Sequence, residues 1–178
     1  MRCHASSKVS AGLQAAFGTP LGKPTIDGIA IDVYSNGDCR FVSDSKTYDA
    51  AGGYLGIAYQ CVEFVRRFVY MRHGVNLAGR WQEGDARDWF DCRETMGLAV
   101  VSADEARAGD ILTFTGGKWG HVGIVADREG DALLMTSQNF LNNAEDVGLC
   151  LSSGLLKGAE TVRDALGTEM AFQSVLRL

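Results

Sequence analysis

The sequence predicts an α+β fold, in which an amphipathic helix packs against an antiparallel β-sheet. Two observations support this prediction. Apolar residues recur with helical spacing from Cys61 to about His73, and short β-prone runs separated by turn residues follow residue 100.

Length and composition indicate one folded domain. The chain has 178 residues, of which 46% are hydrophobic and 22% charged, close to average globular usage, so a disordered or fibrous chain is excluded. Both prolines lie in residues 19–28, which read as a loop before the fold proper. We therefore expect residues 1–178 to form a single domain, with residues 1–25 at its periphery.

Charge and hydropathy exclude several classes of partner. The net charge is −5 and there is no basic stripe, so no nucleic acid is expected as a partner. No stretch approaches the ~20 apolar residues that cross a bilayer, and the start lacks the apolar core of a signal peptide. We expect no membrane partner and a cytoplasmic protein, while export without a signal peptide and the oligomeric state remain open.

The cysteines do not form a metal or redox motif. They are odd in number and widely spaced, so at least one thiol should be free, and we expect no metal and no cofactor. The five positions are Cys3, Cys39, Cys61, Cys92 and Cys150.

The first half of the chain contains one strand pattern and one clear helix pattern. Residues 28–37 alternate in polarity and end in a polar turn, which predicts a half-buried strand. The helix should end near His73, because Gly74 suits a left-handed cap, and Glu63, Arg66 and Arg67 should point away from the apolar face. The apolar face consists of Cys61, Phe64, Val65, Phe68 and Val69.

The second half is predicted to be mainly antiparallel sheet. Its apolar runs are strand-length and are separated by glycine-rich or charged turns; they cover residues 111–114, 121–126, 132–139 and 171–178. Two shorter helices are predicted over residues 81–92 and 154–167.

Cys61 is the candidate nucleophile. A thiol attacks as the thiolate, which the positive end of a helix favours, and Cys61 opens the predicted helix. His4 lies in the peripheral start and His73 is ~18 Å away along the helix. His121, at the start of an apolar run, is the remaining candidate base, although elimination alone leaves a structural role open.

Three motifs resemble a known family. The runs YQCVEFVRRF (59–68), AGDIL (108–112) and GHVGIV (120–125) are similar, in order and spacing, to CHAP domains, the cysteine, histidine-dependent amidohydrolases/peptidases. The resemblance extends from about Gly28 to the C-terminus. Within the family, GIAIDVYSNG and SQN resemble the amidase domains of glutathionylspermidine synthetase/amidases.

The resemblance implies a papain-like fold and a thioester mechanism. Cys61 would attack an amide carbonyl and His121 would transfer the proton. Gln60 and the Cys61 backbone amide would donate to the oxyanion, with helix capping as the alternative role for Gln60. The substrate would be a small-molecule or peptide amide, and Arg66 would help to hold it, although a solvated helix face is the alternative. Trp119 would form a wall of the cleft or simply pack.

The sequence departs from the family pattern at one position. CHAP amidases usually carry Glu-Gln-Asn where this chain has Ser137-Gln138-Asn139, so the glutamate that orients the histidine is missing. On a strand Ser137 and Asn139 would share a face, and either side chain can accept a hydrogen bond; we favour Asn139. Three functions therefore stay open: an amidase similar to glutathionylspermidine amidase, a peptidoglycan-cleaving endopeptidase or amidase, and a catalytically degraded domain that binds peptide.

Overall fold

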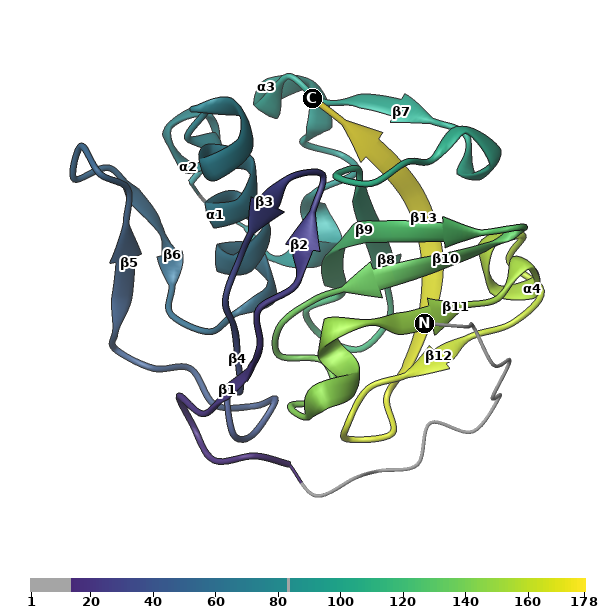
Figure 1. Cartoon of the computed structure of the whole chain (residues 1–178), viewed down its shortest axis with the longest axis horizontal. Helices are drawn as coiled ribbons and strands as arrows, with labels where there is room; N and C mark the ends of the chain where they lie inside the picture. The colour runs from purple at the N-terminus through teal and green to yellow at the C-terminus, as the bar shows by residue number, and fades with distance from the viewer. Residues whose placement is uncertain (1–13, 83) are drawn as a thin grey trace.

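A computed structural model of the chain describes residues 14–82 and 84–178. Its centre is an antiparallel sheet with strand order β11-β10-β9-β8-β13-β12, to which β7 adds by pairing with β13 (Figure 1). The strands are β7 (Ala99–Val101), β8 (Ile111–Thr115), β9 (His121–Glu129), β10 (Ala132–Thr136), β11 (Leu149–Leu151), β12 (Val162–Arg163) and β13 (Glu169–Arg177). The four predicted runs of the second half correspond to β8, β9, β10 and β13, so the antiparallel sheet is confirmed.

Short antiparallel pairs precede and flank the long helix. They are β1 (Pro20–Gly22) with β4 (Val33–Tyr34), β2 (Thr25–Ile26) with β3 (Ile29–Ala30), and β5 (Lys46–Tyr48) with β6 (Tyr54–Ile57). The alternating segment 28–37 thus forms two short strands instead of one. The loop expected over residues 19–28 instead contains β1 and β2, and Ile26 is fully buried.

The long helix is confirmed with the predicted bounds. Helix α1 (Cys61–His73) ends at Gly74, which has φ 67° and whose N–H donates to the carbonyl of Tyr70. The other helical elements are α2 (Leu77–Arg80), η1 (Ala86–Asp88), α3 (Arg93–Met96), η2 (Ala103–Glu105), η3 (Ala144–Val147) and α4 (Ser153–Leu156).

Both faces of the sheet are buried. Successive residues of a strand point to opposite faces, and on β9 Val122 and Ile124 pack with the apolar residues of α1. Val125 belongs to a second cluster, formed with residues of β10, β11 and β13 and with the segment after β10. The sheet therefore holds α1 rigidly against β9, which positions the start of the helix beside the start of the strand.

Two local predictions are wrong. Residues 81–92 hold η1 and turns in place of one helix, and residues 154–167 hold the end of α4 and β12. The alternative of a solvated helix face for Arg66 is also wrong, since Glu63 and Arg66 are buried and Arg67 is partly buried in an ion pair with Glu63. The polar face of α1 is covered by other elements, among them β6 and α2, which helical periodicity cannot reveal.

Candidate active site

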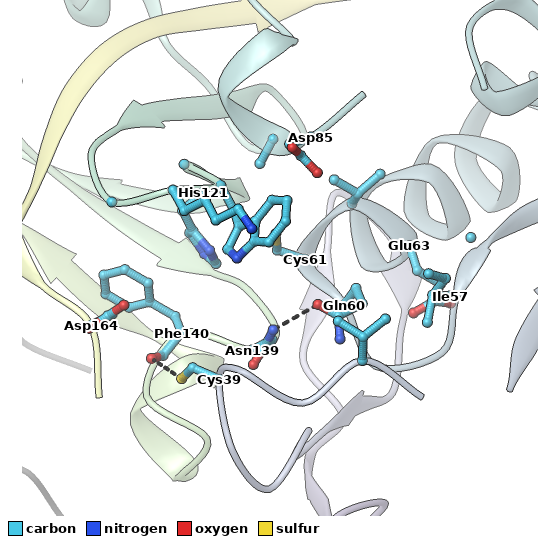
Figure 2. A pocket seen from close by; sticks show the side chains of 18 of the residues that line it. Cys39, Ile57, Gln60, Cys61, Glu63, Asp85, His121, Asn139, Phe140 and Asp164 are labelled. Atoms are coloured by element: carbon cyan, nitrogen blue, oxygen red, sulfur yellow. Dashed lines mark hydrogen bonds between the residues drawn. The ribbon is translucent and has the colours of Figure 1, made fainter. Parts of the chain in front are cut away.

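A cavity of about 520 Å³ opens where α1 and β9 begin. Cys61 and His121 both line it, and Figure 2 shows both side chains directed into it. Four further predicted site residues line the same cavity, namely Gln60, Arg66, Trp119 and Asn139. Residues from opposite halves of the chain therefore meet in one pocket, and Ser137 lies outside its lining.

Cys61 is positioned by the start of α1. The residue is 9% exposed, and the backbone amides of Val122, Val62 and Cys61 point toward the sulfur. These amides favour the thiolate, but burial has the larger effect and raises the pKa of Cys61 to about 11. At neutral pH the free protein therefore carries Cys61 as the thiol.

His121 is the first residue of β9 and is 2% exposed. Gly120 before it has φ 65°, and a Cβ there would lie 2.7 Å from the backbone of Arg87, so glycine permits the close approach of η1. Burial lowers the pKa of His121 to about 3, which keeps the imidazole neutral. The hydrogen bonds of the described residues do not include one between His121 and Cys61, and His121 Nε2 has no partner among them.

Gln60 does not cap the helix with its side chain. Its Nε2 donates to Asn36 Oδ1 (3.2 Å) and to the carbonyl of Phe41 (3.0 Å), and its Oε1 accepts from Asn139 Nδ2 (2.8 Å). The capping alternative is therefore wrong. Both amide hydrogens are engaged, so donation to an oxyanion would require Gln60 to exchange a partner. The N–H of Cys61, in the first turn of α1, points toward its own sulfur and has no oxygen acceptor among the described hydrogen bonds.

Asn139 is held by other partners than His121. Its amide donates to Gln60 (Figure 2) and its Oδ1 accepts from Asn142 Nδ2 (3.3 Å), contrary to the expectation that Asn139 orients the imidazole. The expectation that Ser137 and Asn139 share a strand face is also wrong. Strand β10 ends at Thr136, and Asn139 adopts φ 59°, so the alternation stops before it.

Arg66 is a buried cation that lines the cavity. It is 2% exposed, and its guanidinium donates to the backbone carbonyls of Leu55 (3.3 Å), Trp81 (2.7 Å) and Gln82 (3.4 Å). Among the described residues its Nε has no hydrogen-bond partner, and their salt bridges do not include Arg66. Burial lowers the pKa of Arg66 to about 10, so the group remains charged at neutral pH.

Trp119 lies at the rim of the cavity. It is 49% exposed, the ammonium of Lys118 sits 4.0 Å from the centre of its ring, and its carbonyl accepts from the N–H of Arg87. About half of the side chain is therefore accessible to a ligand. This exposure favours the role of a cleft wall over that of a packed core residue.

Several residues of the site carry no sequence motif. Asp85 and Cys39 line the cavity, and the negative charge of Asp85 contributes to raising the pKa of Cys61. Cys39, Cys61 and Cys92 are free thiols, as expected for at least one cysteine, and burial raises the pKa of Cys39 to about 12. Phe140 packs on His121 with ring centres 4.5 Å apart. No sequence signal could have found these neighbours, because they come from loops that only the fold brings together.

Comparison with known proteins places this site in a family. The CHAP domain family model matches residues 51–139, which include Cys61, His121 and Asn139. The chain belongs to this family, and membership points to hydrolase activity of the amidase or peptidase type. The papain-like arrangement is consistent with the mixed helix and antiparallel sheet described above.

Two curated relatives are bifunctional glutathionylspermidine synthetase/amidases, from Escherichia coli (strain K12) and Shigella flexneri. Each is 28% identical over 153 residues, which cover 77% of this chain. The chain spans about a quarter of the length of these relatives, 25% in each case.

Among the described residues, none of the helices combines the length and the apolar character of a membrane-spanning segment.

Proposed function

We propose that this protein is a cysteine-dependent amidase that hydrolyses an amide bond through a thioester. The observation that carries the proposal is the meeting of Cys61, at the start of α1, and His121, at the start of β9, in one cavity of about 520 Å³. A thiol at a helix start beside a neutral imidazole is the combination that thiol-dependent acyl transfer requires.

The reaction begins with Cys61 as the thiol and His121 as the neutral imidazole. Neutral His121 removes the thiol proton of Cys61 as the sulfur attacks the substrate carbonyl carbon, and the backbone N–H of Cys61 donates to the oxyanion. The C–N bond then breaks, and the imidazolium returns the proton to the departing amine. Water, deprotonated by His121, attacks the thioester, and the C–S bond breaks to release the acid and the free thiol.

Ser137 is the better candidate to orient His121. Its Oγ is buried without a partner among the described residues, as is His121 Nε2. Strands β9 and β10 are antiparallel and pair Thr136 with Ile124, so the chain that follows Thr136 runs toward the start of β9, where His121 lies. The hydroxyl can accept an N–H from the imidazole, but it cannot stabilise the imidazolium as a carboxylate would.

Replacing Ser137 with alanine is therefore expected to lower kcat by about tenfold and to leave KM unchanged, because only the orientation of the base is lost. Steady-state kinetics of amide hydrolysis test this, with Ser45→Ala as a control on an exposed serine. Unchanged turnover in Ser137→Ala would remove Ser137 from the mechanism.

Arg66 supports a substrate that carries an anionic group. A buried guanidinium whose described partners are backbone carbonyls retains its charge and part of its donor capacity for a ligand. Glutathione conjugates carry carboxylates, and the relatives are named for glutathionylspermidine, so an amide of glutathione with a polyamine is the proposed substrate.

Replacing Arg66 with methionine is expected to raise KM by about 10- to 100-fold, with a smaller change in kcat, because a charged hydrogen bond to the substrate is lost. Arg66→Lys keeps the positive charge but not the planar guanidinium, so its KM should lie between that of the wild type and that of Arg66→Met. Thermal unfolding of each variant checks that the fold survives, and Arg163→Met serves as the exposed control. A KM that does not move in Arg66→Met would show that the substrate does not use this cation.

The function itself is tested by measuring the release of free amine from glutathionylspermidine and from muropeptides, with Cys61→Ala as the control. Cleavage of the conjugate alone supports the proposed substrate, and cleavage of muropeptides assigns the protein to cell-wall amides. Binding of either compound without cleavage would instead show a domain that has lost catalysis and retains a peptide site.

A further inference from the structure

The turn that follows β10 carries two groups that contact the active site. Asn139 donates from its amide to Gln60, next to the nucleophile, and the ring of Phe140 packs on His121 at 4.5 Å between centres and 41° between planes. Figure 2 shows Asn139 and Phe140 side by side at the wall of the cavity. The turn thus contacts His121 directly and Gln60, the residue that precedes Cys61.

The backbone of this turn is wrapped around a buried carboxylate. Asp146, in η3, is 1% exposed and accepts N–H groups from Leu141 (2.8 Å), Asn142 (2.9 Å) and Phe140 (3.5 Å). Its own carbonyl accepts from the N–H of Ser137 (2.8 Å). The described salt bridges do not include Asp146, and its described hydrogen-bond donors are backbone amides.

These hydrogen bonds hold a conformation that the chain does not favour by itself. Asn139 and Asn142 adopt φ values of 59° and 56°, in the left-handed region, which asparagine tolerates better than other non-glycine residues but which is still less favourable than extended or right-handed backbone. A cluster of inward N–H groups on one carboxylate offsets that cost. Without Asp146 the turn would lose the acceptor around which it folds.

Phe140 is fixed on its other side as well. Its carbonyl accepts from the N–H of Ala165 (2.9 Å) and from the thiol of Cys39 (3.3 Å), and the side chain is buried. His121, in contrast, has no described hydrogen bond through Nε2. Among the described residues no carboxylate bonds to Nε2, so the packing of the imidazole ring against Phe140 helps to orient it, beside the contact proposed above for Ser137.

We propose that Asp146 and Phe140 are positioning residues for catalysis: the Asp146 carboxylate shapes the turn, and the turn presses the Phe140 ring against His121 so that the imidazole faces Cys61. This inference rests on the proposed amidase function. Asp146 does not line the cavity, and Phe140, which lines it, is 1% exposed and acts here through His121, so their replacement should change the chemical step much more than substrate binding.

The test compares Phe140→Leu and Asp146→Asn with two matched controls, Phe172→Leu and Glu145→Gln. Phe172 is an aromatic residue of β13 whose described ring contact is with Phe114 and not with His121, and Glu145 is an exposed acid next to Asp146. For each protein, kcat and KM for amide hydrolysis, the rate of iodoacetamide alkylation of Cys61 by peptide mass spectrometry, and the thermal unfolding midpoint are measured. Using two variants guards against the failure of either one to fold.

We expect Phe140→Leu and Asp146→Asn to lower kcat by about tenfold or more with KM unchanged, and to slow the alkylation of Cys61, in protein that remains folded at the assay temperature. The controls should match the wild type. Unchanged kcat and alkylation rates in both folded variants would overturn the inference. A decrease in kcat that is fully explained by the fraction of unfolded protein would overturn it as well. If Cys61→Ala were as active as the wild type, the proposed function would fail instead; the alkylation rates would still decide whether the turn positions His121.

Discussion

Replacing Cys61 with alanine is expected to lower kcat for amide hydrolysis by at least about 10⁴-fold, because the covalent thioester cannot form. KM should change little, since the thiol contributes to bond making and not to the wider contacts of the cavity. The alanine variant should also fail to form the acyl-enzyme that a rapid quench of the wild type would trap. Intact-protein mass spectrometry of the quenched reaction measures that adduct.

Cys92→Ala provides the matched control, because Cys92 is a free thiol that packs against the core and does not line the cavity. Its kcat should equal that of the wild type. An acyl adduct on a peptide that does not contain Cys61, or full activity in Cys61→Ala, would contradict the assignment of the nucleophile.

Replacing His121 with glutamine is expected to lower kcat by about 10³-fold and also to change how stability depends on pH. The folded protein holds the pKa of His121 near 3, whereas the unfolded chain takes up a proton below the ordinary value of 6.5. Because the folded pKa is depressed, the unfolded state binds more protons, and the free energy of unfolding falls as pH decreases from 6.5 toward 3. For this one group the loss at pH 4 is about 3 kcal/mol.

Urea unfolding of the wild type and of His121→Gln at pH 7 and pH 4 measures this effect. The stability difference between the two proteins should shift by about 3 kcal/mol in favour of the variant at the lower pH. Asp146, whose pKa burial raises to about 7, contributes with the opposite sign but is present in both proteins and cancels. A difference that stays constant with pH would show that the imidazole is not buried as the structure has it.

The elements with strong periodicity were predictable from the chain alone. Helix α1 has the expected bounds because its apolar residues repeat every three or four positions and Gly74 supplies a left-handed cap. Strands β8, β9, β10 and β13 follow from β-prone runs between turns. Residues 81–92 and 154–167 contain glycines and a weak period, so tertiary contacts determined their structure, and those contacts favoured turns and one-turn helices over a continuous helix.

The sequence by itself determined which groups can do chemistry: a cysteine that opens a helix, and one histidine that can reach it. Motif order then indicated the family, as the comparison confirms. What only the tertiary structure decided is how those groups are held. It buried Arg66, engaged Gln60 with Asn139, and placed Phe140 against His121. These contacts join segments about 11 to 79 positions apart, and the burial that shifts the pKa of Cys61 and His121 arises only when such segments pack and exclude water.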